Sequence, residues 1–363
     1  MTNELKLPFY AKAALFFVGI YVFVSMLNIG SDIIIPLIFG TIISILLHPV
    51  VRFFERHKIN RVLAIIITLL LSFILIAAFA LFMFSQLSRF SDSWPAFVEK
   101  FTNLLNQAIL WAPGYFDISI DKVNELINRL KDELLNLSSS FIGQTIVSVG
   151  NGIMIFTLIP VYVFLMLFYE PLLIDFVYKL FGEDRQEKVK EIITQTKTVI
   201  QHYLVGLLIQ IVLVATLDSI GLLVMGIDYA IMIGIIGALL NLIPYVGGLM
   251  AVALPMMIAL ITKDSPWFVL YIIAFYMFIQ LIDNNFIVPK IVASKVRINA
   301  LVSIIVVLAG GALWGIAGMF LSIPLVAIVK VICDHIEPLK PIGFLLGDTM
   351  PEIVIFKIKR PKK

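Results

Sequence analysis

The sequence predicts an all-α polytopic membrane protein, with about six full spans and two helical hairpins that enter the membrane from opposite faces. Of its 363 residues, 61% are hydrophobic and 14% are charged, whereas a soluble domain is about half apolar and about a quarter charged. Several apolar stretches reach or approach the roughly 20 residues that a helix needs to cross a bilayer. Two longer apolar stretches are interrupted by glycine or proline, which indicates breaks within them.

Hydropathy predicts where the full spans lie. We expect membrane helices near residues 11–28, 33–51, 62–87, 147–169, 202–226 and 267–288. The first run lacks a small-residue cleavage site, so we interpret it as a membrane helix and not as a removed signal peptide.

The spans also predict how the chain is organised. Expected in order are a scaffold of three N-terminal helices (1–87), an extracytoplasmic amphipathic segment (88–146), a fourth span with a cytoplasmic amphipathic helix (147–200), a transport unit with two spans and two hairpins (201–335) and a basic cytoplasmic tail (336–363). The outer segment, with "SIDKVNELINRLKDELLNL", has an apolar stripe at helical spacing. It is expected to lie on the protein or lipid surface, or to contact another subunit.

Positive charge in the short loops predicts that both termini are cytoplasmic. The basic segments "RFFERHKINR", "PKIVASKVR" and "KIKRPKK" should all lie inside, whereas residues 88–145 contain more Asp and Glu than Lys and Arg. Counting crossings from a cytoplasmic N-terminus reproduces these sides only if 229–262 and 299–332 each return to the side they entered. Both are therefore predicted to be hairpins.

The first hairpin breaks at "NLIPYVGGLM". Pro244 lacks an amide proton, and Gly247 and Gly248 permit backbone angles closed to other residues. Its arms, near 229–242 and 248–262, would each be about 20 Å long at about 1.5 Å per residue. That is shorter than the roughly 30 Å hydrocarbon core, which favours a hairpin that turns back within the membrane.

The second hairpin is predicted to break at a run of glycines. These are Gly310, Gly311, Gly315 and Gly318. Each hairpin follows a full span, and the two spans run in opposite directions, so the pattern is an inverted span-plus-hairpin repeat. Such repeats recur in transporters, where broken helices form the substrate site. The alternative is two kinked hairpins that pack through small residues.

Polar residues within the apolar stretches are candidates for a solute or ion path. A central Asp in a membrane helix costs about 2.5–3.5 kcal/mol, so such residues usually face a cavity or a partner. The candidates are Asp218, Asn241, Tyr245, Gln280, Asp283 and Asn284, with Gln210 weaker. For Asp283 and Asn284 the alternative is a hydrated helix end.

Several other functions are not supported. The net charge of +3 is too small to indicate a nucleic-acid partner, and the single Cys333 excludes an intrachain disulfide and a Cys-based zinc site. No hydrolase, zinc-protease or phosphate-loop motif is found. We therefore expect no enzyme activity, no cofactor and no metal.

Three stretches carry a resemblance to a known family. They are "LNLIPYVGGLMAVALP", "QLIDNNFIVPKIVASKVRINALVSIIVVLAGGALWGIAGMFLSIPL" and "LIPVYVFLMLFYE". The chain resembles the AI-2E family of bacterial transporters, the autoinducer-2 exporter family. The matching positions are Ile243, Pro244 and Gly247; Asp283, Asn284 and Pro289; Gly315, Gly318, Met319 and Pro324.

The resemblance implies a secondary transporter in the bacterial cell membrane that works without ATP. It also implies a ring-like homo-oligomer, with five subunits as the best guess. The family includes proteins linked to autoinducer-2 export, others linked to sodium/proton exchange, and many without an assigned substrate. It therefore leaves the substrate open.

Three functional hypotheses remain. The first is an exporter of a small polar solute such as autoinducer-2, which neutral groups at Asn241, Tyr245, Gln280 and Asn284 would bind. The second is a cation/proton antiporter that uses Asp218 or Asp283. The third is a non-transporting scaffold whose outer segment is the functional part. Under the first two, the hairpin breaks are predicted to be two gates that meet near the midplane, with partners limited to the lipid bilayer, the solute or cation, and other subunits.

Overall fold

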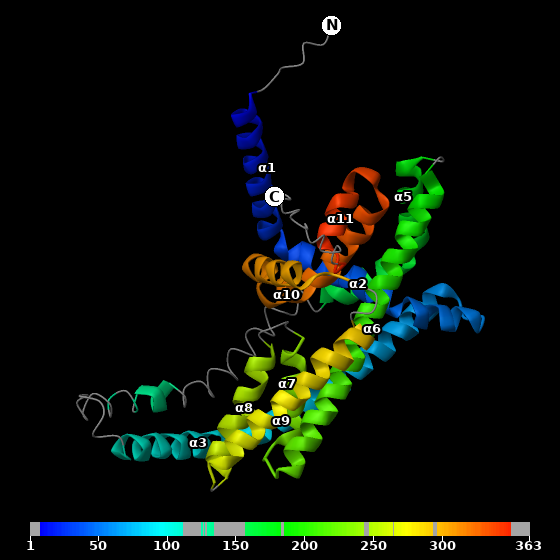
Figure 1. Cartoon of the computed structure of the whole chain (residues 1–363). Helices are drawn as coiled ribbons and strands as arrows, with labels where there is room; N and C mark the ends of the chain where they lie inside the picture. Colours follow the sequence, from blue (N-terminus) through cyan, green and yellow to red (C-terminus); the bar gives the residue numbers. More distant parts are fainter. Residues whose placement is uncertain are drawn as a thin grey trace, which may run out of the picture.

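The computed structural model describes residues 8–111, 125, 127, 129–133, 157–182, 185–242, 247–263, 265–292 and 296–349 (Figure 1). These residues form helices, and the β-structure among them is a single isolated bridge between Ile298 and Gly347. The predicted all-α class is confirmed. Six of the described helices are long and apolar enough to cross a membrane, and a bent pair, 157–168 with α5 (Glu170–Phe181), would make a seventh.

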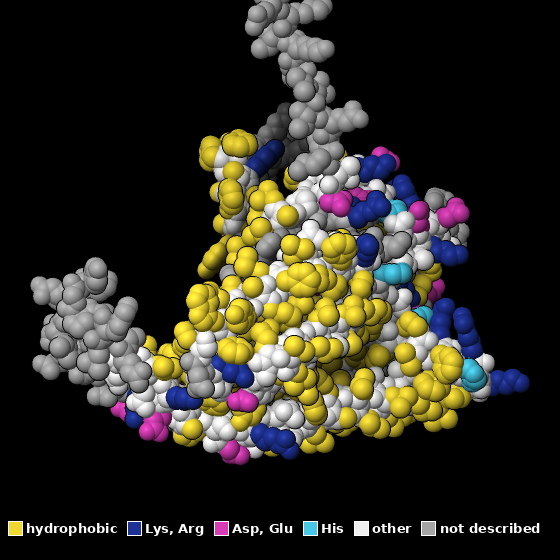
Figure 2. All heavy atoms as spheres, turned by 60° about the horizontal axis from the view of Figure 1, so that its bottom comes forward, with side chains coloured by type: hydrophobic (Ala, Val, Ile, Leu, Met, Phe, Trp, Pro, Cys, Tyr) yellow, Lys and Arg dark blue, Asp and Glu magenta, His cyan; other side chains and the backbone are white. Residues whose placement is uncertain are grey.

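The surface agrees with a membrane location. Exposed aromatic and aliphatic side chains run along α1 (Phe9–Ile29), along α3 (Arg61–Trp111) and over much of the transport unit. Figure 2 shows a broad field of hydrophobic side chains on one face, with charged side chains gathered at its edges. Water would not favour this much exposed apolar surface. The protein is a multi-pass membrane protein, and the orientation of its termini stays a prediction.

The third helix is longer than expected. The structure shows one helix, α3, of 51 residues, or about 75 Å at about 1.5 Å per residue. It does not end at the expected boundary after residue 87, because no glycine or proline follows until Pro95. The first residues of the predicted outer segment therefore continue the same helix. Most of the predicted amphipathic stretch 119–137 lies outside the described residues.

Helix α6 (Gln186–Val224) is central to the architecture. It contacts α2 (Ser31–Arg56), α5, α7 (Ala230–Leu240), α9 (Trp267–Ile282) and α10 (Ala300–His335). Its polar first turns continue without a break into the apolar span. Because α6 contacts both hairpins, it fixes where their side chains converge.

The first predicted hairpin is present. α7 is followed by α8 (Gly247–Thr262), and α8 packs on α9 (Figure 1). Its arms bury Ile233 and Ile258 with Ile272 of α9, each 0% exposed. Pro244 and Tyr245, at the predicted break, lie outside the described residues.

The second hairpin turns at one point. Within α10 the backbone leaves helical geometry at Trp314 (φ −135°) and Gly315 (φ 60°). Of the predicted break residues, Gly315 therefore forms the turn, while Gly310, Gly311 and Gly318 lie in the helical arms. There they let the arms approach closely, since a Cβ on Gly318 would lie 2.0 Å from the Gly310 carbonyl oxygen. The Ser322 hydroxyl also donates to the Val306 carbonyl across the arms, at 2.8 Å.

The C-terminal segment is more structured than a basic tail. A 3₁₀ turn, Glu337–Leu339, leads into α11 (Lys340–Leu346), which packs on α10. The Asn299 amide donates to the carbonyls of Leu345 (2.7 Å) and Gly347 (3.0 Å), and its Oδ1 accepts from the Val302 amide at the start of α10. One side chain therefore both caps α10 and holds the end of α11. Residues 350–363 lie outside the described part.

Glu170, at the start of α5, joins α5 to the helices α2, α3 and α6. Its side chain is 19% exposed and contacts His48 Nε2 of α2 at 3.1 Å, Arg61 of α3 at 3.2 Å and the Lys197 ammonium of α6. Arg61 also donates to the Leu167 carbonyl, at 2.6 Å, beside the 64° bend that precedes α5. Glu170 thus ties the bend to the helices around it.

We predict that Glu170→Gln lowers the free energy of unfolding by about 1–3 kcal/mol, because Arg61 and Lys197 lose a partly buried counter-charge. An SDS titration of the purified protein in mixed micelles would measure it. The matched control is Asp175→Asn, whose pair with Lys179 is exposed and should contribute about 0–1 kcal/mol. Equal effects of the two substitutions would contradict the role given to Glu170.

Candidate functional site

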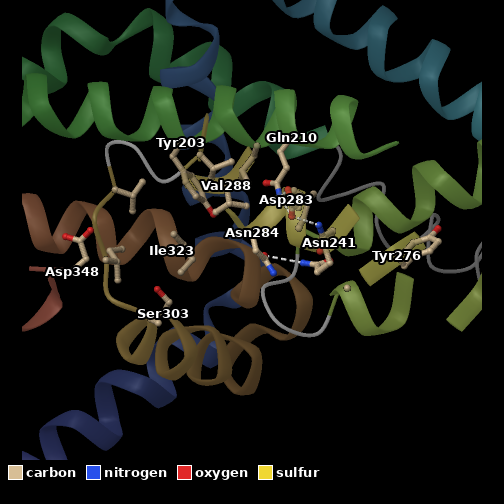
Figure 3. A pocket seen from close by; sticks show the side chains of 18 of the residues that line it. Tyr203, Gln210, Asn241, Tyr276, Asp283, Asn284, Val288, Ser303, Ile323 and Asp348 are labelled. Atoms are coloured by element: carbon tan, nitrogen blue, oxygen red, sulfur yellow. Dashed lines mark hydrogen bonds between the residues drawn. The ribbon is translucent and has the colours of Figure 1, made fainter. Parts of the chain in front are cut away.

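A cavity of about 920 Å³ lies between α6, the tip of the first hairpin, α9 and α10. In Figure 3, Gln210, Asn241, Asp283 and Asn284 lie close together, whereas Tyr276 and Asp348 lie at opposite sides of the view. Apolar side chains line much of its wall, and its polar groups come from Tyr203, Gln210, Asn241, Tyr276, Gln280, Asp283, Asn284, Arg297, Ser303 and Asp348. A concave, mostly apolar space with a few converging polar groups is the usual form of a ligand site.

The Asp283 carboxylate is the most constrained polar group of the cavity. It is 2% exposed. Gln210 Nε2 of α6 donates to both of its oxygens at 3.0 Å, and Asn241 Nδ2, just after α7, donates to Oδ2 at 2.9 Å (Figure 3). A buried carboxylate is stable only with such donors. Three segments far apart in sequence are therefore joined at one group.

The backbone changes its winding at this residue. α9 ends at Ile282, and Asp283–Val292 forms a π-helix, η2. π-Helical turns are rare and are frequently found at functional sites. The sequence analysis predicts one continuous span over 267–288, so this change was missed, although Pro289 within η2 marks a position that cannot donate an α-helical hydrogen bond.

A second polar pair lies beside the hairpin tip. Gln280 Nε2 donates to Asn284 Oδ1 at 3.2 Å, one helical turn apart. A Cβ on Gly248 would lie 2.8 Å from Gln280 Oε1. The absence of a side chain at Gly248 thus leaves room for the Gln280 amide against the tip.

Asp218 occupies a different position from Asp283. It is 2% exposed and does not line the cavity, whereas Tyr276, 7% exposed, does. Among the described residues, Asp218 Oδ1 and the Tyr276 hydroxyl are buried polar atoms without a hydrogen-bond partner. Both groups lie against Gly237 of α7: a Cβ there would be 3.5 Å from Asp218 Oδ2 and 3.7 Å from the Tyr276 oxygen.

The site residues predicted from the sequence do not all lie at the cavity. Asn241, Gln280, Asp283 and Asn284 meet at the cavity, with Asp218 behind it, while Tyr245 lies outside the described residues. Gln210, only a weak candidate in sequence, is a direct partner of Asp283. The sequence analysis missed Arg297 and Asp348, which belong to loop positions with no local signal.

The second break does not line the cavity. Trp314 Nε1 donates to the Leu27 carbonyl of α1 at 3.0 Å, and α10 reaches the cavity through Ser303 and Ile323, away from its turn. In this conformation the turn is therefore docked on α1. The predicted meeting of the two tips stays a prediction, because Tyr245 is not described.

Comparison with known proteins agrees with this architecture. The profile described as AI-2E family transporter matches residues 11–337. The chain belongs to the AI-2E transporter family. Its relatives include the putative transport proteins YueF and YrrI of Bacillus subtilis, 25% and 27% identical, which match over 85% and 84% of this chain and 86% and 87% of their own lengths.

A relative with a named substrate is more distant. The AI-2 transport protein TqsA of Escherichia coli is 24% identical over 90% of this chain and 92% of its own length. Apart from Asp348, the residues that line the cavity lie within the part of the chain that the family profile matches.

We predict that Gly247→Ala destabilises the hairpin tip. Its Cβ would lie 1.9 Å from the Leu240 carbonyl oxygen and 2.7 Å from Asn241 Cα, and such overpacking costs about 1–3 kcal/mol. Unfolding by SDS titration would measure the loss. The matched control is Gly19→Ala in α1, where nothing lies within 4 Å and no destabilisation is expected. If the two variants were equally stable, the tip geometry would be wrong.

Proposed function

We propose that this AI-2E family protein is a secondary transporter that exports a small polar solute, such as autoinducer-2, by alternating access through the cavity. The observation that carries the proposal is the convergence of amide and carboxylate groups from α6, the hairpin tip and the α9–η2 helix on one space. Backbone without helical hydrogen bonds is tolerated at membrane depth when it is buried in protein or lines a wet cavity.

The polar groups suit a solute with several hydroxyl or carbonyl groups. The amides of Asn241, Gln280 and Asn284 offer both donors and acceptors. Asn284 is exposed toward the open space, and its bond to Gln280 could be exchanged for a bond to the solute. The relative TqsA, whose name states AI-2 transport, supports this solute class.

Movement of the hairpin tip would alternate the access. Asn241 follows α7 at the break and is held to Asp283 by one hydrogen bond. A solute that binds Asp283 or Gln280 would change the free energy of the conformation in which the tip of the first hairpin lies against these residues. A ligand shifts a conformational equilibrium only through such a difference in affinity.

A solute screen in reconstituted vesicles, with imposed proton and sodium gradients, tests this function. Gly248→Leu should abolish flux of any solute that the wild-type protein moves, because the added side chain would occupy the space of the Gln280 amide. Membrane insertion and oligomer size should not change. The control, Gly19→Leu, adds the same side chain at a position with no neighbour within 4 Å. Full flux through Gly248→Leu would contradict a path past this tip.

Cation/proton antiport is the second candidate, and one observation favours it: an acidic group, Asp283, lines the cavity itself. A carboxylate there could bind a cation and a proton in turn. The amides of Gln210 and Asn241 would be displaced or would turn their oxygens toward the cation.

If the protein is an antiporter, Asp283→Asn should abolish sodium-driven proton flux, because an amide cannot exchange a proton for a cation. A pH-sensitive dye inside proteoliposomes would report the flux. The matched variant Asp228→Asn changes an exposed carboxyl and should retain it. Sodium-driven proton flux through Asp283→Asn equal to wild type would exclude Asp283 as the exchanging group.

A further inference from the structure

Asp218 and Tyr276 form a polar site separate from the cavity. Asp218 Oδ1 and the Tyr276 hydroxyl are buried without a partner among the described residues, and both groups lie against Gly237. The contrast with Asp283 is direct. Both oxygens of Asp283 receive amide donors, so the same pair of helices holds one satisfied carboxyl group and one whose Oδ1 has no donor.

An ionised carboxylate without donors is costly at membrane depth. The group avoids this cost by binding either a proton or a metal cation. A hard cation usually requires about six oxygen ligands, and few oxygen atoms around Asp218 are free to act as ligands. The Gly237 carbonyl oxygen already accepts a hydrogen bond from the backbone N–H of Asn241, at 3.0 Å. In the described part of the chain, no group of three or more His, Cys, Asp or Glu that could hold a metal ion is found. A proton fits this site better.

The position of Tyr276 links the site to the cavity. Tyr276 lines the cavity, whereas Asp218 does not. In this conformation the two groups are not hydrogen-bonded to each other, and the tyrosine hydroxyl is buried. A movement of the helices that brings them together and opens the hydroxyl to the cavity would let the Asp218 proton pass through Tyr276, which gives up its own proton as it receives one. Afterwards Asp218 is ionised and Tyr276 is again neutral, and its hydroxyl can donate to the carboxylate.

We propose that Asp218 and Tyr276 are a proton-binding site that couples proton movement to transport through the cavity. This inference rests on the proposed transport function. α6 carries both Asp218 and Gln210, and the α9–η2 helix carries both Tyr276 and Asp283. A shift of one helix pair thus changes the proton site and the cavity site together.

The charged surroundings make the two sites interdependent. The ionisable groups that face Asp218 are Tyr276 and Asp283, and the neighbouring α7 and α8 contain no Asp, Glu, Lys, Arg or His. When Asp218 loses its proton, its negative charge repels the Asp283 carboxylate. A positive charge or a hydrogen-bond donor beside Asp283 then becomes more favourable. Proton release and occupancy of the cavity are therefore thermodynamically linked.

Infrared difference spectroscopy on the purified protein in nanodiscs, between acidic and alkaline buffer, tests the site without any solute. The probe is the proton itself. We expect a carbonyl-stretch signal from a protonated carboxyl in a dry environment that disappears on alkalinisation. Asp218→Asn should remove this signal, and Tyr276→Phe should keep it, because the tyrosine does not hold the proton. Asp228→Asn, at an exposed position, should leave it unchanged.

Two results would overturn the proposal. One is a signal that persists in Asp218→Asn, which would place the protonated carboxyl elsewhere. The other is the absence of any pH-dependent change that Asp218→Asn removes, which would mean that Asp218 does not exchange a proton. Failure of the solute screen with an intact Asp218 signal would count against the solute proposed above and not against this site.

Discussion

The arrangement of α6, the first hairpin and the α9–η2 helix depends on the burial of one carboxyl group, that of Asp283. A 2% exposed carboxylate requires donors, and these come from α6 through Gln210 and from the hairpin break through Asn241. The apolar packing around Ile233 and Ile258 would hold the hairpin arms against α9 without these bonds. It would not fix the tip, because hydrophobic contact is non-directional. The hydrogen bonds specify where the tip sits.

The two hairpins stabilise the chain at their breaks in different ways. The first opens onto the cavity, where Asn241 and Gly248 meet polar groups of α9 and η2. The second is stabilised by the close approach of its arms, by Ser322 bonding across them and by Trp314 on the Leu27 carbonyl. Among the described residues, Asn241 and Gly248 beside the first break line the cavity, whereas Trp314 and Gly315 at the second break do not. The inverted repeat in the sequence therefore does not imply two equivalent halves of a binding site.

Much of the fold could be predicted from the sequence because hydropathy and glycine breaks are local signals. The all-α class and the first hairpin follow from them. The role of Gln210 could not be predicted, since its partner Asp283 is 73 residues away. The end of α3 was misplaced because hydropathy marks where the apolar stretch ends, whereas the helix continues beyond it and through Pro95 to Trp111. The π-helix η2 depends on tertiary contacts with α6, which no local pattern records.

The different surroundings of Asp218 and Asp283 bear on how the protonation of one group could change the conformation of the hairpin. Two carboxyl groups in different environments are the usual means by which one protein holds a proton at one site and a negative charge at another. Here both are carried by the same two helical elements, and the hairpin tip is bonded to only one of them. A change in protonation at Asp218 therefore alters the electrostatic free energy of Asp283, and with it the strength of the bond to Asn241. Since that bond specifies the tip position, a proton can bias the conformation of the hairpin without contacting the solute.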